Sequence, residues 1–324
     1  MRKEKLVIEL GSTNTVIYKQ GYGIVLREPS ALTINSKDYS VVDAGLKAKK
    51  MQGKVNESIL YVEPIENGII TDEKCAELML DYFLNKVITK SAFAKISATF
   101  CVSIGLDDNQ LLAYKNIAYN CGIDNVEFVN TCSASLMGAD SKASSNGAVA
   151  CVNIGGGTVN MAVISYGNTV DGFSLTFGGK DMDNAIIDYV KGVKGIEVSQ
   201  SIAEKIKNEC GSLYLQDTSN MEIIGSDCET KKPVSDIIAS YEVREAVSYY
   251  FDTILKGIEH LLHSCTADII KDIMQNGLYL TGGVANFTGL ENYLTKGLNL
   301  RVIIPDEPEN CAVLGAGLVE EKIA

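Results

Sequence analysis

The segment Cys151–Ser165, CVNIGGGTVNMAVIS, contains two apolar runs separated by the glycine turn Gly155-Gly156-Gly157-Thr158. This pattern predicts two β-strands joined by a hairpin turn with almost no side-chain bulk. Glycines let backbone N–H groups come close to an anion, and the Thr158 hydroxyl adds a donor, so the turn is suited to binding a phosphate. The turn is flanked by Asn153 and Asn160, where chemistry on a phosphoryl group usually needs carboxylates. The segment therefore predicts a phosphate-binding hairpin whose catalytic chemistry is in question.

The same order of elements opens the chain. Leu6-Val7-Ile8 leads into Gly11-Ser12-Thr13-Asn14, and the apolar run Val16-Ile17-Tyr18 follows. A third glycine turn, Leu280-Thr281-Gly282-Gly283, comes after an expected strand at 277–280 and before a helical segment. Such a junction can hold a phosphate or a ribose at the start of the helix. Many hairpins have one glycine turn for geometry alone, whereas three turns spread over both halves favour phosphate binding.

Between these turns, short apolar strands alternate with helical patterns. Further strands are expected at 24–26, 31–34, 97–104 and 126–129, and helices at 43–51, 72–88, 108–121, 133–139, 183–191 and 315–322. The small polar stretch Ser141–Gly147 separates the two series and is expected to be a linker. This repeated order predicts an α/β protein with two similar domains and a cleft between them.

Composition narrows the functional classes. The chain has 324 residues, enough for two domains, and its net charge of −12 argues against binding a nucleic-acid backbone. No run approaches 18 apolar residues and the charged start passes directly into a strand, so neither a transmembrane helix nor a signal peptide is expected. The nine cysteines are scattered without a C-x-x-C motif, which favours a reducing cytoplasm over a disulfide framework or a zinc site.

Seven segments of the chain also resemble, in the same order, the bacterial actin-like rod-shape-determining protein family, MreB and its paralogues such as Mbl. They are IELGSTNT, GIVLREPSALTIN, GLKAKKMQGKVNESILYVEPIENGIITD, NIGGGTVNMAVIS, GGKDMDNAIIDYV, AEKIKNECGS and LYLTGGVANFTGL. The resemblance spans nearly the whole chain and implies an actin-like fold, related to the Hsp70 and hexokinase ATPase domains, that closes on ATP and Mg²⁺. It also implies filaments under the membrane that guide cell-wall synthesis and cell shape.

The resemblance also implies domain limits. Domain I is expected at residues 1–140 plus 315–324, with a small subdomain at about 30–66. Domain II is expected at residues 141–314, with a small subdomain at about 182–240. The nucleotide would lie between the two domains.

Matching the family's motifs residue by residue implies nucleotide contacts in both domains. Two groups correspond to the phosphate hairpins, a third to the ribose and base contacts, and a fourth to the segment that holds the nucleoside. The groups are Ser12, Thr13 and Asn14; Gly156, Gly157 and Thr158; Glu204, Lys205, Ile206 and Lys207; and Gly282, Gly283, Val284 and Ala285. Val284 stands where the family has a third glycine.

The sequence departs from the family at its acidic positions. Glu9 stands where an aspartate helps to order Mg²⁺ and its waters, so a longer side chain must reach the metal. Asn153 and Asn160 stand at the family's Asp and Glu positions, and neither can act as a base. Thr131 falls where a Glu-Glu-Pro segment carries the glutamate that positions the attacking water. These changes predict that ATP, or another purine nucleotide, still binds while its hydrolysis is very slow or absent.

Three alternatives stay open. Asn153 and Asn160 can instead satisfy local backbone groups at strand ends, and for Asn160 this is as good an interpretation as a role in the site. The chain can be a fully active ATPase of the same family, with Glu9 and a water held by Thr131 sufficing. A sugar or acid kinase or a chaperone-type ATPase fits less well, because no acceptor-activating carboxylate stands on a glycine loop and no substrate domain follows.

The expected partners follow from the family resemblance. The first is the chain itself, in a homopolymer filament, and the second is an active paralogue in a copolymer. The loop around Phe93 carries Lys90 and Lys95, which suits contact with the inner leaflet of the membrane, although a solvated loop explains it nearly as well. The expected location is the cytoplasm, with membrane association through this loop, and nucleic acid is not an expected partner.

Overall fold

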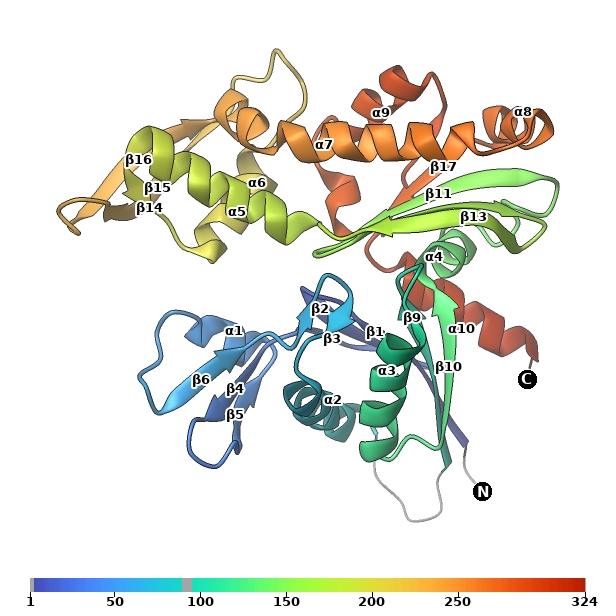
Figure 1. The fold of residues 1–324 in the computed structure, drawn as a ribbon, viewed down its shortest axis with the longest axis horizontal. Coiled ribbons are helices and arrows are strands. Elements are labelled where there is room, and N and C mark those ends of the chain that lie inside the picture. The colour runs from blue at the N-terminus through green and yellow to red at the C-terminus, as the bar shows by residue number, and fades with distance from the viewer. Residues whose placement is uncertain (1–2, 89–94, 324) are drawn as a thin grey trace.

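The computed structural model describes residues 3–88 and 95–323 and has two α/β halves (Figure 1). Each half has a five-stranded sheet in which an antiparallel three-stranded unit continues into parallel strands. The first sheet has the order β10-β9-β1-β2-β3 and the second β13-β12-β11-β17-β18. The predicted α/β design with a repeated hairpin is therefore confirmed.

Most strands of the two sheets follow the predicted apolar runs, whereas β13 and β18 were not predicted. Those of the first sheet are β1 (Lys3–Leu10), β2 (Asn14–Lys19), β3 (Gly23–Pro29), β9 (Lys95–Val102) and β10 (Asn125–Asn130). Those of the second are β11 (Ala148–Ile154), β12 (Val159–Ser165), β13 (Asn168–Leu175), β17 (Leu278–Thr281) and β18 (Val302–Ile303). The β1–β2 and β11–β12 connections are two of the three glycine turns.

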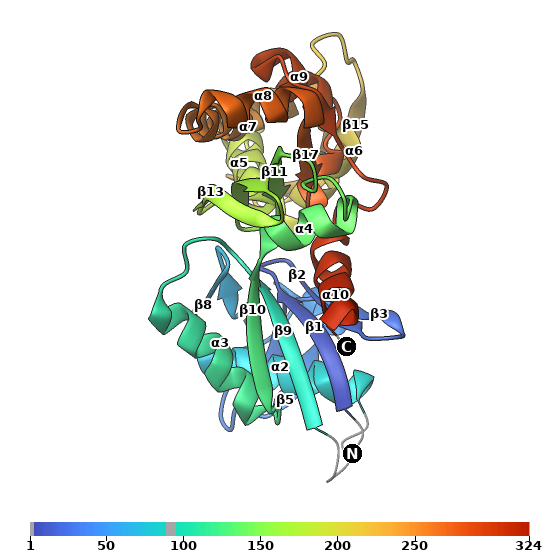
Figure 2. The same ribbon diagram turned by 90° about the vertical axis from the view of Figure 1, so that its right-hand side faces the viewer.

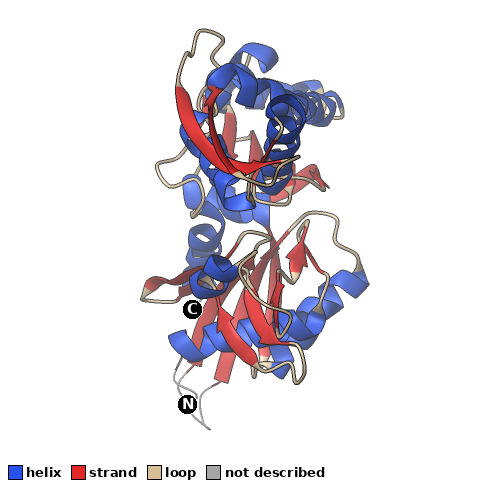
Figure 3. Ribbon diagram, turned by 90° about the vertical axis from the view of Figure 1, so that its left-hand side faces the viewer, coloured by secondary structure: helices blue, strands red, loops and turns tan. Residues whose placement is uncertain are grey.

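Helices cover both faces of the first sheet, as Figure 3 shows from one side. One face packs against α2 (Glu73–Val87) and α3 (Asp108–Asn120), and the other against α4 (Thr131–Ala139) and α10 (Cys311–Ile323). Side-chain caps start several of these helices; the Asn130 carboxamide, for example, accepts a hydrogen bond from Ser133 N at 2.7 Å. Helix α4 also packs against the second sheet through Cys132 and Leu136, so it joins the two halves (Figure 2).

The second half is completed by α7 (Ser240–His263), α8 (Ala267–Asn276), a 3₁₀ turn at Gly283–Asn286 and α9 (Leu290–Leu298). Its buried apolar residues form one large cluster around the sheet and α7, separate from the cluster of the first half. Among the residues that the structure describes, no helix is both long enough and apolar enough to cross a membrane.

Each half carries a smaller unit, and the two units face each other at the left of Figure 1. The unit on the first half contains β4 (Leu32–Asn35), β5 (Val41–Ala44), α1 (Leu46–Met51) and β6 (Ile59–Val62), followed by β7 (Ile65–Glu66) and β8 (Ile69–Ile70). The unit on the second contains α5 (Gly179–Tyr189), a π-helical turn (Val190–Lys194), β14 (Ile196–Glu197), α6 (Gln200–Cys210), β15 (Asn220–Asp227) and β16 (Pro233–Ala239).

Several predicted helix limits are wrong. The helix expected from Asp43 starts only at Leu46, because Asp43 and Ala44 pair with β4 as part of β5. The helix expected at 183–191 starts earlier, at Gly179, and the one expected at 315–322 starts at Cys311. In both cases the first turn packs against another element, which local sequence does not reveal. The Phe93 loop lies outside the described residues.

Candidate nucleotide-binding cleft

A cleft of about 450 Å³ lies between the two halves, where the three glycine turns meet. Residues from both domains that the family resemblance connected with a nucleotide line this cleft. They are Ser12, Thr13, Asn14, Gly156, Gly157, Thr158, Glu204, Lys207, Gly282, Gly283 and Val284. The altered acidic positions Glu9, Thr131, Asn153 and Asn160 line the same cleft. The structure therefore brings together residues from both halves of the sequence.

Three of the expected contacts lie outside the cleft. On α6, Lys205 points to solvent and pairs with Glu209 at 3.8 Å, while Ile206 is fully buried in the core of the second half. A helix turns 100° per residue, so only Glu204 and Lys207 of this run share the cleft face. Ala285 belongs to the 3₁₀ turn and is buried in the same core. Sequence matching marked the whole segments, whereas helix geometry selects among their members.

The turns Gly11–Asn14 and Gly155–Thr158, called here the first and the second phosphate-type turn, are in close contact. A Cβ atom added to Gly156 would lie 1.9 Å from Thr13 Oγ1, and one added to Gly157 would lie 2.5 Å from Ser12 Oγ. No residue other than glycine fits there without displacing the opposite turn. The Ser12 hydroxyl also accepts a hydrogen bond from Gly68 N at 3.2 Å. Hydroxyl and backbone donors from both halves thus converge on one place, as phosphate binding requires.

The start of α5 packs on the second turn. Gly179 N donates to Gly155 O at 3.0 Å and Lys180 N donates to Gly156 O at 2.8 Å. A Cβ atom at Gly178 would lie 2.6 Å from Gly155 O, so this contact also needs glycine. These bonds explain why α5 begins at Gly179. They connect the phosphate-type turn directly to the smaller unit of the second half.

Glu9 supplies a carboxylate to the lining of the cleft, two residues before the first turn at Gly11. Desolvation by the surrounding protein raises the pKa of Glu9 from 4.5 to about 7, and the positive charge of Arg27 acts in the opposite direction. Arg27 itself donates to the carbonyl of Glu309 and to the carboxamide of Asn310. A partly desolvated acid of this kind fits a bound cation. The described residues offer no group of three or more His, Cys, Asp or Glu side chains that could hold a metal, so Mg²⁺ would need phosphate oxygens as further ligands.

Asn153 and Thr131 are both oriented by buried partners. The Asn153 Nδ2 group donates to Ser135 Oγ at 3.2 Å and to Thr281 Oγ1 at 3.1 Å, which leaves the carboxamide oxygen for the cleft. The Thr131 hydroxyl donates to Val102 O at 3.0 Å, so its proton is engaged and only its lone pairs face a ligand. Both groups can accept a hydrogen bond from water. Neither offers the basic carboxylate that would remove a proton from it.

Asn160 is almost fully buried and connects the halves. Its Oδ1 accepts hydrogen bonds from Ile104 N at 3.0 Å and from Ser174 Oγ at 2.6 Å, and its Nδ2 donates to Thr158 Oγ1 at 3.3 Å. Ile104 lies just beyond β9 of the first half. The side chain therefore satisfies a local backbone group and also orients a hydroxyl of the phosphate-type turn.

A buried ion pair lies at the other end of the cleft. Lys207 Nζ contacts Asp183 Oδ1 at 2.7 Å and donates to Gly179 O at 2.8 Å. Burial raises the pKa of Asp183 from 3.8 to about 6, against the lowering effect of Lys207. The pair fixes the Lys207 side chain against α5. Lys207 and Glu204 therefore line the cleft from one helix face, with Lys207 held rigidly.

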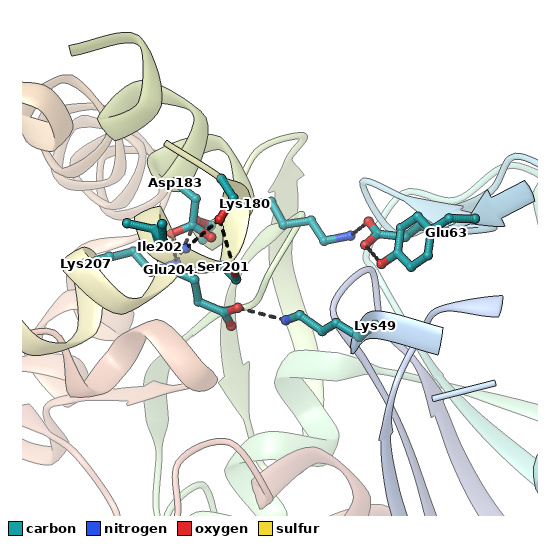
Figure 4. Close-up of polar contacts among 11 residues, drawn as sticks. Lys49, Glu63, Lys180, Asp183, Ser201, Ile202, Glu204 and Lys207 are labelled. Atoms are coloured by element: carbon teal, nitrogen blue, oxygen red, sulfur yellow. Dashed lines mark hydrogen bonds and ion pairs between the residues drawn. The ribbon is translucent and has the colours of Figure 1, made fainter. Parts of the chain in front are cut away.

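Two further ion pairs cross the mouth of the cleft (Figure 4). Lys49 of α1 contacts Glu204 of α6 at 2.8 Å. Lys180 of α5 contacts Glu63, which directly follows the end of β6. Sequence reasoning missed Lys49, Glu63, Lys180, Asp183 and Arg27 as cleft residues. Their only signal in the sequence is charge, and charged residues are common on every surface.

Two halves of one topology, closing on a cleft lined by glycine turns, define a protein of the actin-fold class. The family model described as MreB/Mbl protein matches residues 3–324. The chain therefore belongs to the MreB/Mbl family.

Individual relatives agree with this family assignment. The chain is 33% identical to the cell shape-determining protein MreB of Pasteurella multocida (strain Pm70), covering 98% of this chain and 93% of the relative. Its structure is similar to that of MreB5 of Spiroplasma citri bound to AMPPNP, with a TM-score of 0.94, 27% identity and coverage of 100% and 97%. It also shares its fold with MamK in a double helical filament, with a TM-score of 0.85 at 18% identity and 99% coverage of both chains.

Proposed function

We propose that this chain is a cytoplasmic cytoskeletal protein that binds ATP or another purine nucleotide, assembles into filaments and acts in cell shape. The observation that carries the proposal is the contact between Gly156-Gly157 and Ser12-Thr13, which places the donors of both halves next to each other in the cleft. The AMPPNP-bound MreB5 and the MamK filament support the nucleotide and the self-association. The cell-shape role is supported by the relatives' names.

In this proposal, different residues of the cleft contact different parts of the nucleotide. Ser12, Thr13, Asn14 and Thr158 would donate to the phosphates, and the three glycine turns would add backbone N–H groups. Glu204 and Lys207 would hold the ribose and base side. Glu9 would hold Mg²⁺, directly or through its waters, and the bound metal would neutralise phosphate charge.

Turnover is proposed to be slow or absent. Of the four altered positions, only Glu9 carries a carboxylate, and in this proposal it serves the metal. Thr131 and Asn153 can hold a water as acceptors, but neither removes a proton from it, and general-base help contributes roughly 10²–10⁴-fold in enzymes. A filament subunit with slow turnover would remain in the triphosphate state, and it would stabilise a copolymer with an active paralogue.

One experiment tests binding and turnover together. ATP affinity and phosphate release would be measured on one sample, with and without Mg²⁺, for the wild type and a T131E/N153D variant. We expect tight binding with release near background, and an increase of at least about 100-fold in the variant. The control N168D/T230E adds the same charges at exposed positions and should stay at background. Brisk release from the wild type would make the chain an ordinary ATPase, and absence of binding would overturn the proposal.

Assembly and membrane contact need separate measurements. Electron microscopy of the AMPPNP-loaded protein should show filaments, and a sample that stays monomeric at high concentration would contradict self-assembly. The Phe93 loop remains a sequence-based prediction of membrane contact. Sedimentation with anionic liposomes should decrease in a Phe93→Ser variant, and failure of the wild type to sediment would reject the contact.

A further inference from the structure

The two ion pairs at the mouth of the cleft join the smaller units of the two halves. Lys49 and Glu63 belong to the unit of the first half, and Glu204 and Lys180 to the unit of the second. Figure 4 shows both pairs spanning the same gap, with the lysine on opposite sides. Side-chain exposure of the four residues lies between 26% and 33%, so water is partly excluded from each pair.

Both pairs are connected to the interior of the site. Lys180 N donates to Gly156 O, so the residue that pairs with Glu63 also supports the phosphate-type turn. Glu204 lies one helical turn from Lys207, which pairs with Asp183. On the other side, the Glu63 carboxylate accepts a hydrogen bond from the Tyr61 hydroxyl at 2.5 Å. Contacts therefore connect both ion pairs at the mouth to other residues of the cleft.

The arrangement of signs specifies one closed geometry. Each unit presents one lysine and one glutamate, in opposite order, so both pairs are satisfied only when the units meet in this register. Exchanging the partners would bring Lys49 against Lys180 and Glu63 against Glu204, and like charges in contact are strongly unfavourable. This order of charges therefore favours one relative position of the two units over all others.

We propose that Lys49–Glu204 and Lys180–Glu63 form a clasp that closes the mouth of the cleft, and that nucleotide exchange requires this clasp to break. The part concerning exchange rests on the proposed nucleotide binding, whereas the part concerning closure does not. Because the pairs are only partly shielded, their attraction is screened by salt. Opening of the cleft and release of nucleotide are therefore faster at high ionic strength.

The first test measures closure without nucleotide. Spin labels at K54C and T230C, both exposed, report the distance between the two units in a C228S/C265S background, since the other seven cysteines are buried. The wild type should give one narrow distance distribution. E63K should broaden and lengthen it, and the exchanged pair E63K/K180E should restore it. The control E57K makes the same charge change at an exposed position of the same unit and should leave it unchanged.

The second test measures exchange with a fluorescent ATP analogue. E63K and K49E should each raise the dissociation rate of the analogue by at least about tenfold. In E63K/K180E the rate should return most of the way to the wild-type value. The wild-type rate should rise with NaCl more steeply than that of E63K. Unchanged distances and rates in E63K, or no recovery in the exchanged pair, would overturn the clasp. A protein that shows the distance changes but binds no analogue would instead overturn the proposed nucleotide function.

Discussion

Asn160 has both of the roles that the sequence allowed for it, one in local backbone hydrogen bonding and one in the site. It satisfies the backbone N–H of Ile104, as a strand-end asparagine would, and it also orients the Thr158 hydroxyl. The carboxamide is suited to both tasks because it carries an acceptor and a donor at once. A carboxylate at this position would keep the acceptor and lose the donor. The uncharged residue is therefore part of the structure of the site as well as a departure from the family pattern.

Replacing Asn160 with aspartate should destabilise the protein. The change removes the bond to Thr158 and places a carboxylate at a position that is only 1% exposed. Loss of a buried hydrogen bond together with burial of a charge is expected to cost about 2 kcal/mol or more of unfolding free energy. Urea unfolding measures it. The exposed Asn168→Asp is the control, with an expected change below about 0.5 kcal/mol. Equal stability of N160D and the wild type would show that the network contributes nothing.

Asp183 makes a pH-dependent contribution to stability. Burial raises its pKa in the folded protein from 3.8 to about 6, so the protonated carboxyl stabilises the fold at low pH and this contribution is lost as pH rises through 6. The D183N variant has no ionisable group at this position and therefore serves as the reference. The unfolding free energy of the wild type minus that of D183N should therefore fall by about 0.8 kcal/mol between pH 5.5 and pH 7.5.

Urea unfolding at the two pH values provides the measurement, with the exposed Asp188→Asn on the same helix as control. A difference that stays constant over this range would mean that attraction to Lys207, at 2.7 Å, offsets the effect of burial on the pKa of Asp183. The carboxyl would then already be ionised in both the folded and the unfolded protein at pH 5.5.

At the scale of elements, α4 and α10 cross unusually closely. A Cβ atom on Gly315 would lie 1.9 Å from Ala134 O, and one on Gly138 would lie 2.0 Å from Cys311 O. Because these obstacles are backbone atoms, no side-chain adjustment can relieve them. Helix α4 packs on both sheets, so the crossing determines how the two halves are joined.

Gly315→Ala should therefore destabilise the protein by about 2 kcal/mol or more, in the range of other overpacked sites. Gly192→Ala is a matched control, because Gly192 lies in the π-helical turn and a Cβ atom added there would meet no other atom within 4 Å. Alanine at this position should be neutral or stabilise the protein by up to about 1 kcal/mol. Thermal or urea unfolding distinguishes the two. Equal effects would show that helix propensity, and not the crossing, governs both positions.

Elements with a strong local signal were predictable from sequence. The hairpins around Gly11 and Gly155 follow from apolar runs interrupted by glycines, and the amphipathic pattern of α2 placed it within one residue at each end. The start of α5 was not predictable, because it depends on bonds from Gly179 and Lys180 to a turn more than twenty residues away. Local patterns report propensity and periodicity, whereas such starts are decided by tertiary contacts.

At the scale of the whole molecule, the three glycine turns could be assigned to one cleft because the duplicated design brings them together. The ion pairs across this cleft could not be predicted. Lys49 and Glu204 are separated by 155 positions, and Glu63 and Lys180 by 117, with no local pattern that connects them. Their pairing depends on how the halves are oriented, which only the folded chain defines. The acids that the family places near the phosphates were recognisable as missing, while Glu63 and the pairing of Glu204 with Lys49 were found only in the structure.

The same architecture predicts how a nucleotide affects stability. Each half has its own large apolar cluster, and the halves share α4 and the cleft. A ligand held by Ser12-Thr13 on one side and Gly156-Gly157 on the other can bind fully only when both halves are folded and together. In calorimetry, AMPPNP at about 100 times its Kd should stabilise the protein by about 2.7 kcal/mol and should draw the unfolding of the two halves toward a single transition.

Gly156→Ala tests whether contact between the turns is the cause. The added methyl group would lie 1.9 Å from Thr13 Oγ1 and 2.8 Å from Thr13 Cβ, so the turns must separate. We expect this variant to keep the unfolding profile of the free protein and to lose most of the AMPPNP-induced shift, while the G192A control keeps it. If G156A responds to AMPPNP like the wild type, contact between the turns is not needed for the nucleotide to couple the two halves. The contacts that couple the halves must then lie elsewhere in the cleft. The clasp residues Lys49, Glu63, Lys180 and Glu204 would then be the first to examine, because their two ion pairs also cross the cleft.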